Sequence, residues 1–187
     1  MTPQARQYYE EIFLKRYVEM QKQIESTPLA VLVWGPGEQQ SGEYGQNLHQ
    51  KRVDIVNALV QQGYAAVFSE DIENDAPQVV DSLAGRELAQ AIVADFIVII
   101  MGSAGSVAEA HDFAGYVRDI GSKMLIFVDA KESGGYSCRG ALADLNTLYG
   151  NVSEFDYPAD VTECHLLGAV QQRLGALRLV KWRMQLR

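Results

Sequence analysis

Blocks of apolar and polar residues alternate along this chain and predict helices and buried strands in turn. Residues 5–25 carry apolar side chains at helical spacing with charged residues between them, which predicts an amphipathic helix ended by Pro28. The run 29–34, "LAVLVW", has no polar residue, as expected of a strand buried on both faces. A polar, glycine-rich loop then leads to a predicted helix at 49–62, which Gly63 ends.

The same unit repeats toward the C-terminus. Further strands are predicted at "YAAVFSE" (64–70), "DFIVIIMG" (95–102) and "KMLIFVDA" (123–130), with a weaker one at "NVSEFDY" (151–157). Helices are predicted between them at 78–94, 106–121 and near 140–149, and a last one starts near Val161. This alternation predicts a doubly wound, Rossmann- or flavodoxin-like α/β fold. We expect a parallel sheet of about five strands, helices on both faces, and extra N- and C-terminal helices.

The 187 residues suit one domain. We expect an N-terminal amphipathic helix at 1–28, a nucleotide-binding core at 29–158 and a basic C-terminal helix at 159–187. No apolar run is long enough to cross a bilayer and no signal-peptide pattern opens the chain, so we expect a cytoplasmic protein without a membrane partner.

Charge argues against a nucleic-acid partner, because the net charge is −8 and duplex binding needs a basic surface. Residues 1–172 hold all 24 acidic but only 11 of the 16 basic side chains, a net charge of −13, and the C-terminal end is purely basic. Basic residues at the C-terminal end of a helix interact favourably with the helix dipole, which explains this composition. The alternative explanation is contact with an acidic partner. Cys138 and Cys164 have no metal-ligand spacing, so we expect two reduced thiols and predict no metal site and no cofactor.

Ligands of such folds bind beyond the carboxyl ends of the strands. Three segments lie there: the loop after Trp34, the stretch "SEDIEND" (69–75), and "MGSAGSVAEAHD" (101–112). The third segment holds a lone carboxylate at Glu109 behind a turn of glycines and serines. We therefore seek the functional site at these three segments.

Glu109 has two interpretations. Ser106 and Glu109 have the spacing of a capping box, which would make both residues structural. Alternatively, Gly102 and Gly105 let the backbone approach a phosphate or a ribose, and Glu109 points at the bound sugar. The residues alone leave both open.

Residues 101–109, "MGSAGSVAE", resemble the P-G-G-x-G-T-x-x-E signature of the "lonely guy" and related SLOG-superfamily proteins. Gly102, Gly105 and Glu109 match that signature, and Ser106 stands for its threonine, whereas Met101 and Ser103 depart from it. The same unit is similar to nucleoside 2-deoxyribosyltransferases and, more distantly, to TIR-type NAD glycohydrolases. The resemblance implies that Glu109 is the catalytic carboxylate of N-glycosidic bond cleavage. It also implies that the turn, including Ser103 and Ser106, holds the ribose or phosphate.

Other residues are candidates for ligand contacts. A second carboxyl group would come from Glu70, Asp71 or Glu38, each of which is otherwise a solvated loop acid. Trp34 and Tyr44 are candidates to stack on a base, Arg86 to bind a phosphate, and Gly35 and Gly37 to line the site.

These observations support two functions and one structural alternative. The first is an N-glycosidase or (deoxy)ribosyl-transferring enzyme acting on a nucleoside monophosphate or NAD. The second is a SLOG-type module that binds a nucleotide signal without cleaving it. The third is a flavodoxin-like protein in which the Ser106 and Glu109 pair only caps a helix. We also expect a homo-oligomer, with the first and last helices as its contact surfaces.

Overall fold

The computed structural model describes residues 1–75, 80–116 and 118–186. Within these ranges it describes only the backbone at positions 73–75, 109, 114, 136, 137 and 141. The chain divides into two units, one of Met1–Pro28 with Arg173–Arg187 and one of Leu29–Gln172.

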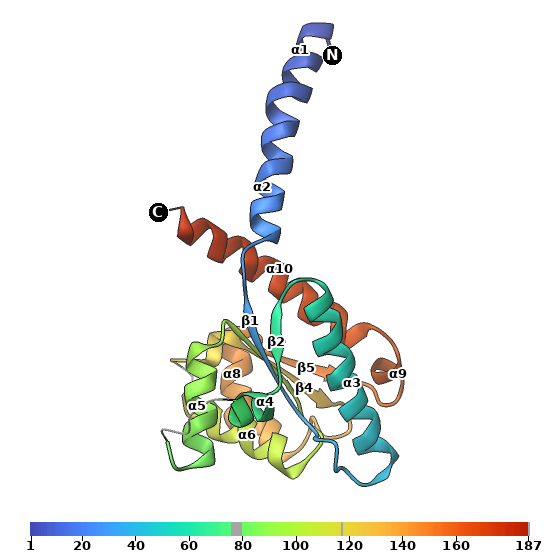
Figure 1. Cartoon of the computed structure of the whole chain (residues 1–187). Coiled ribbons are helices and arrows are strands. Elements are labelled where there is room, and N and C mark those ends of the chain that lie inside the picture. The colour runs from blue at the N-terminus through green and yellow to red at the C-terminus, as the bar shows by residue number, and fades with distance from the viewer. Residues whose placement is uncertain (76–79, 117, 187) are drawn as a thin grey trace. The chain divides into compact units, whose positions relative to one another are not determined.

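The larger unit is built on a five-stranded sheet, as predicted (Figure 1). Its strands are β1 (Ala30–Trp34), β2 (Ala65–Val67), β3 (Phe96–Ile100), β4 (Met124–Asp129) and β5 (Val152–Phe155). They lie in the order β2-β1-β3-β4-β5, and every neighbouring pair is parallel. The order reverses between β1 and β3, so the carboxyl ends of these two strands flank the crevice where doubly wound folds bind ligands.

Helices cover both faces of the sheet. They are α3 (Gly42–Gln61), α4 (Ser69–Asp75), α5 (Leu83–Val93), α6 (Ala104–Ala114), the 3-10 turn η2 (Gly121–Lys123), α7 (Tyr136–Arg139), α8 (Ala141–Tyr149), α9 (Ala159–Thr162) and the start of α10 (His165–Gln185). Figure 1 shows α3, with α9 beside it, on one side of the sheet and α5, α6 and α8 on the other.

The strands are apolar on both faces because each face is covered. On β3, Ile97 and Ile99 belong to the core cluster under α5, α6 and α8, while Val98 and Ile100 alternate to the opposite face. All four side chains are fully buried. This two-sided burial is the physical reason for the unbroken apolar runs in the sequence.

Several helices differ from the prediction. Helix α5 begins at Leu83, and positions 78 and 79 of the predicted helix lie outside the described residues. Helix α6 spans Ala104–Ala114 rather than 106–121. Helix α3 starts at Gly42 rather than at residue 49, because Ser41 has the extended backbone of an N-cap and Glu43 places an acid in the first turn. The "SEDIEND" stretch, expected as a loop, forms α4, with Glu70 and Asp71 in its first turn. Gly63 does end α3 as predicted, and it adopts the left-handed backbone typical of that position, with φ of 79°.

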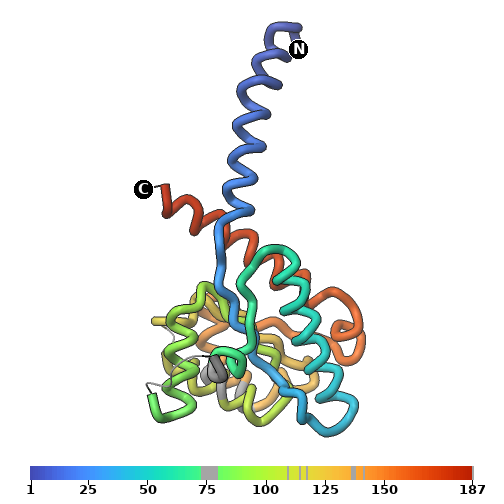
Figure 2. Tube along the Cα trace, viewed as in Figure 1, coloured from blue at the N-terminus to red at the C-terminus, as the bar shows by residue number. Residues whose placement is uncertain are grey.

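The N-terminal part of the smaller unit is helical from Pro3 onward, as predicted. Helix α1 (Pro3–Tyr8), a π-helical stretch η1 (Tyr9–Leu14) and α2 (Lys15–Glu25) follow one another without a break, which the trace in Figure 2 makes plain. Thr2 caps the start by accepting a hydrogen bond from the backbone N–H of Ala5. In the described part of the chain, no helix has both the length and the apolar character required to cross a membrane.

Candidate functional site

A cavity of about 580 Å³ opens at the carboxyl ends of β3 and β4. Its volume lies in the range of small-molecule sites. It is lined by Tyr44, Met101, Gly102, Ser103, Ala104, Val107, Val128, Asp129, Lys131, Glu132, Gly135, Cys138 and Tyr157. The cavity therefore brings together the turn after β3, the end of β4, the start of α3 and the segment after β5.

Gly102 lies where the turn after β3 meets the loop after β1. A Cβ atom at Gly102 would lie 2.2 Å from Cδ1 of Leu48 and 3.2 Å from Cγ of Pro36. Leu48 is fully buried, and the Pro36 carbonyl lies 3.1 Å from Nδ1 of His49, so both neighbours are anchored by α3. Close packing thus requires glycine at position 102, whether or not a ligand is bound.

Ser103 and Ser106 form the cap of α6. Ser103 is the N-cap, and its hydroxyl accepts a hydrogen bond of 3.2 Å from the N–H of Ser106. The Ser106 hydroxyl is buried and accepts from the N–H groups of Gly102 and Ser103, at 3.1 and 3.0 Å. The predicted capping box of Ser106 with Glu109 is therefore wrong, because the helix begins at Ala104, two residues before Ser106.

Helix α6 begins at the edge of the cavity. Ala104, which lines the cavity, and Gly105 occupy the first two helical positions, where helix geometry supplies no backbone acceptor. Glu109 lies in α6, beyond the capping positions, and its side chain is outside the described residues. The capping alternative for Glu109 is removed, and its catalytic role stays a prediction.

Asp129 brings a buried carboxylate to the end of β4. Its side chain is 5% exposed, and it accepts a hydrogen bond of 3.0 Å from the backbone N–H of Lys131. Tyr44 lines the cavity together with this carboxylate. Burial, and after it the nearby Asp129 carboxylate, raise the pKa of Tyr44 far above its ordinary value. Tyr44 therefore stays a neutral hydrogen-bond donor at every physiological pH.

Two tyrosines form an aromatic wall beside this carboxylate. The rings of Tyr44 and Tyr157 meet edge to face, with centroids 4.7 Å apart. The Tyr157 hydroxyl accepts a hydrogen bond of 2.9 Å from the side chain of Asn47 on α3. Both rings line the cavity. Tyr44, expected in the loop after β1, lies in the first turn of α3, and its stacking on a base stays a prediction.

The remaining polar lining is acidic with one cation. Glu132 and Asp129 carry carboxylates, and the exposed Lys131 carries an ammonium group. Burial, helped by Glu154 and Glu132, raises the pKa of the Cys138 thiol. Cys138 is thus protonated near neutral pH and is not an activated nucleophile. Cys138 and Cys164 are both free thiols.

Glu70 pairs with Arg52 and does not line the cavity. Its two carboxylate oxygens accept hydrogen bonds of 2.7 Å from Nη1 and Nη2 of Arg52. The buried Arg52 also donates from Nε and Nη2 to the Val33 carbonyl, at 3.0 and 2.9 Å, and its guanidinium lies 4.3 Å from the centroid of the Phe68 ring. Glu70 therefore has a structural partner that accounts for both of its oxygens.

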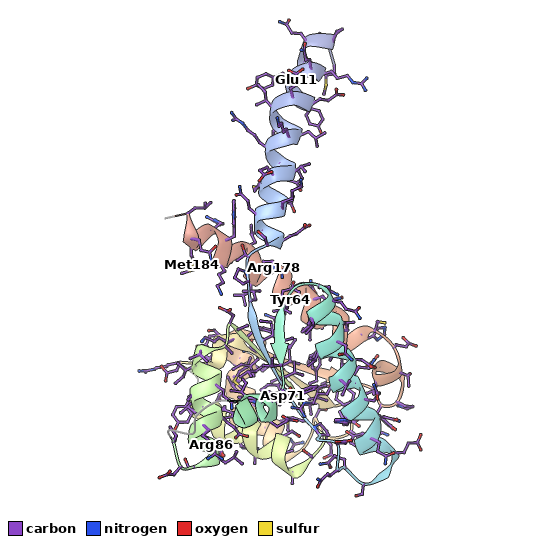
Figure 3. The ribbon with its side chains drawn as sticks, viewed as in Figure 1. Glu11, Tyr64, Asp71, Arg86, Arg178 and Met184 are labelled. Atoms are coloured by element: carbon purple, nitrogen blue, oxygen red, sulfur yellow. The ribbon has the colours of Figure 1, made fainter. Side chains whose placement is uncertain are left out.

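The other predicted contacts lie away from the cavity lining. Trp34 is 1% exposed and stacks on Phe113 in the core, with centroids 4.8 Å apart. Arg86, labelled on α5 in Figure 3, donates to the Val80 and Asp81 carbonyls just before that helix. Gly35 lies against the Ile100 backbone, and a Cβ atom there would be 3.1 Å from the Ile100 carbonyl oxygen. Gly37, Gly105, Ser106 and the exposed Glu38 and Asp71 are also outside the lining.

Asp129 and Tyr157 were not anticipated as site residues. A signal for Asp129 was present, because a carboxylate directly after the run "MLIFV" is placed at the carboxyl edge of a buried parallel strand. Tyr157 is the last residue of the weakest predicted strand, and its contact with Tyr44 is a long-range one that no local pattern reveals. Over the described residues, no three His, Cys, Asp or Glu side chains are grouped to hold a metal ion.

Comparisons of the chain with protein-family models and with curated proteins found no match.

Proposed function

We propose that the cavity binds a nucleoside or nucleotide and that the chain cleaves its N-glycosidic bond. The observation that carries this proposal is the buried Asp129 carboxylate, which lines one cavity together with Tyr44 and the turn at the start of α6. Carboxylates accept hydrogen bonds from ribose hydroxyls, and a tyrosine wall suits a flat base. The position beside the sheet's switch point supports the same ligand class.

A phosphate has two sources of attraction at this edge of the sheet. The N–H groups of Ala104 and Gly105 begin α6, and the Lys131 ammonium group is the cation of the cavity lining. Asp129 and Glu132 oppose a highly charged ligand there. We therefore favour a nucleoside, a nucleoside monophosphate or the nicotinamide riboside half of NAD over a triphosphate.

Cleavage would follow the chemistry of glycosidic bonds. The C1′–N bond breaks with its electron pair moving to the base, and positive charge develops on the sugar ring. Glu109, one helical turn or more beyond the cap, is the carboxylate proposed to stabilise that charge, as the resemblance implies. A water oxygen then bonds to C1′ and keeps one of its protons as the new hydroxyl group. The other proton goes to the departing base or, where the base leaves neutral as nicotinamide does, to the solvent or a carboxylate.

The test is release of free base from NAD, nucleoside monophosphates and deoxynucleosides. Wild type would be compared with Glu109→Gln and Asp129→Asn. Asp54→Asn, at an exposed position of α3, serves as the control. We expect release by wild type and the control, at least about 100-fold slower release by Glu109→Gln, and weakened binding by Asp129→Asn. Equal rates for wild type and Glu109→Gln would exclude Glu109 as the catalytic group.

A binding module without cleavage is the second candidate, and one observation favours it. The N–H groups of Gly102 and Ser103 already donate hydrogen bonds to the Ser106 hydroxyl, so these two donors are not available to a phosphate. No base release together with a melting temperature raised by one of the same compounds would establish binding alone. No release and no change in melting temperature would contradict both candidates.

A further inference from the structure

The buried carboxylate of the cavity has no cation of the protein beside it. Asp129 is 5% exposed, and one of its oxygens accepts from the backbone N–H of Lys131. Across the residues that the structure describes, no basic side chain lies within ion-pair distance of it. Glu70 shows the contrast, because its carboxylate is paired with Arg52. A buried charge without an opposite one is costly, so this position favours a ligand that brings a positive charge.

The other charges of the lining do not cancel that of Asp129. Of the described lining residues, Glu132 and Lys131 carry the remaining charges, and both residues are exposed. Their opposite charges are screened by solvent and offset one another. The Asp129 charge lies away from water, where the effective dielectric constant is lower. The described lining is therefore electronegative, and the unit Leu29–Gln172 has the same sign, with 20 acidic and 7 basic residues.

The pKa values of two lining groups agree with this sign. Burial, and after it the carboxylates of Asp129 and Glu132, raise the pKa of Tyr44. Burial, and after it the carboxylates of Glu154 and Glu132, raise the pKa of Cys138. Tyr44 lines the cavity from the first turn of α3 and Cys138 from α7. The negative potential thus acts on groups from separate elements of the lining.

The aromatic wall of the cavity suits a flat cation. The rings of Tyr44 and Tyr157 both line the cavity and meet edge to face. The faces of aromatic rings attract cations, and proteins use this attraction to recognise organic cations. A compact ammonium group is strongly hydrated, whereas a planar ring with a delocalised positive charge is more weakly hydrated and also stacks on tyrosine. The lining therefore fits a positively charged aromatic ring.

We propose that the cavity selects a nucleoside whose base carries a positive charge. This inference rests on the proposed function and narrows its substrate class. The base would lie at the two tyrosines, with its charge attracted by Asp129 and Glu132. Purine nucleosides with an alkylated ring nitrogen and pyridinium ribosides are of this class. The two phosphates of a dinucleotide would meet the same carboxylates, so a nucleoside without phosphate is favoured.

Cleavage of such a nucleoside needs no proton from the cavity. The C1′–N bond breaks with its electron pair moving to the nitrogen, so the cationic base leaves as a neutral molecule. Water bonds to C1′, keeps one proton in the new hydroxyl group and gives the other to the solvent or a carboxylate. Tyr44 and Cys138 are poor proton donors, because their pKa values are raised. A base that requires no proton therefore fits this lining.

The test is calorimetric titration of the full chain with matched cationic and neutral nucleosides. One pair is 7-methylguanosine, measured on the acid side of neutrality where its base is cationic, and guanosine. The other pair is nicotinamide riboside and its uncharged dihydro form. The titrations use wild type and Glu109→Gln, in which slow cleavage keeps the ligand intact. We expect the Kd of each cationic member to be at least about tenfold lower than that of its neutral counterpart.

Three results would overturn the proposal. They are equal affinities within either pair, no binding of either cationic nucleoside, and tighter binding of NAD than of nicotinamide riboside. The last result would mean that contacts with the remainder of the dinucleotide, rather than the charge of the base, decide the affinity.

Charge variants assign the preference to individual side chains. Asp129→Asn keeps an acceptor for the Lys131 N–H but removes the charge, and it should reduce the preference to about twofold. Glu132→Gln, at the exposed rim, should reduce it by about threefold and is the second variant if Asp129→Asn does not fold. Lys131→Met removes the opposing charge and should enlarge it. Asp54→Asn, an exposed acid outside the lining, is the control and should leave it unchanged. An unchanged preference in both Asp129→Asn and Glu132→Gln would contradict the proposal.

Ring variants separate the aromatic face from the tyrosine hydroxyl. Tyr44→Phe keeps the ring and should keep the preference for the cationic nucleosides, whereas Tyr44→Leu should lower it by about threefold or more. Melting temperatures of both variants check that the fold is retained. Equal preferences in Tyr44→Phe and Tyr44→Leu would mean that the ring does not hold the cation.

Failure of this inference and failure of the proposed function have different signatures. Cationic nucleosides that bind with the expected preference but release no base would support the selection by charge and contradict cleavage. Release of base from neutral nucleosides, with equal affinities within both pairs, would support cleavage and contradict the selection by charge.

Discussion

Arg52 and Glu70 join the first two strands of the sheet through a two-point ion pair. Arg52 is buried on α3, and it holds the Val33 carbonyl at the end of β1 while two oxygens of Glu70, on α4 after β2, accept from it at 2.7 Å. A planar guanidinium is suited to several acceptors at once. The pair therefore fixes the start of α4 beside β1.

Removing either partner is expected to destabilise the protein unequally. Arg52→Met leaves the buried Val33 carbonyl without this donor and should lower the free energy of unfolding by about 3 kcal/mol. Glu70→Gln keeps one acceptor on a half-exposed side chain and should cost about 1 kcal/mol. Urea unfolding measures the free energy of unfolding of both variants. Glu43→Gln, at an exposed position in the first turn of α3, is the control and is expected within about 0.5 kcal/mol of wild type. A larger loss for Glu70→Gln than for Arg52→Met would contradict this account.

The ion pair also predicts a dependence of stability on pH. Partial burial alone would raise the pKa of Glu70. The hydrogen bonds that its carboxylate accepts from Arg52, from its own backbone and from Ser69, together with the charge of Arg52, outweigh this effect. The pKa of Glu70 is therefore held below its ordinary value of 4.5. A carboxyl group with a lowered pKa contributes stability above the unfolded value and loses it as the pH falls through the folded one.

The difference in unfolding free energy between wild type and Glu70→Gln should therefore be constant near neutral pH and shrink below about pH 4.5. Urea unfolding at several pH values measures this difference, in which the acid sensitivity of the other carboxylates cancels. A difference that grew toward acid pH would mean that the pKa of Glu70 is raised in the folded protein.

Gly102→Ala is expected to lower the free energy of unfolding by about 1–3 kcal/mol, because the added Cβ would lie 2.2 Å from the buried Leu48. The cost should largely disappear in a Leu48→Ala background, where the obstructing atom is gone, so a double-mutant cycle isolates the contact. Gly105→Ala is the matched control, since its Cβ would meet only the Ser103 hydroxyl at 3.8 Å among the described atoms. Additive effects of Gly102→Ala and Leu48→Ala would rule out this contact as the cause.

Ser106→Ala is expected to cost about 1–3 kcal/mol, because it removes the acceptor shared by the N–H groups of Gly102 and Ser103. If a ligand phosphate takes those two donors, the same variant should bind the phosphorylated ligand more tightly than wild type, relative to the nucleoside. Thermal unfolding and calorimetric titration measure the two effects, and the exposed Ser122→Ala serves as the control. An unchanged melting temperature would mean that the hydroxyl is replaced by solvent.

The fold was predictable because burial on both faces of a strand leaves a local mark. The runs before Trp34, Ile100 and Asp129 are unbroken by polar residues, and each became a parallel strand. The early start of α3 and the existence of α4 were not predictable in this way. Their first turns are polar and are set by capping and by the contact with Arg52, which carry no apolar period.

The site was predictable only in its outline. The turn at Gly102 and Ser103 was expected at the carboxyl edge and does line the cavity, and so does Tyr44. Trp34 shows what the sequence does not determine. A residue at the end of a strand points to the site or to the core depending on the face of the sheet on which its side chain lies. It faces Phe113 in the core. The pairing of Tyr44 with Asp129 joins residues far apart in sequence, and only the assembled sheet brings them together.

The two outermost strands of the sheet have a consequence for how the sheet meets other chains. The edge strands β2 and β5 span only Ala65–Val67 and Val152–Phe155. A short edge offers a foreign strand few unpaired backbone groups, which protects a sheet from edge-to-edge aggregation. We therefore expect this sheet to resist growth by the addition of strands from other chains.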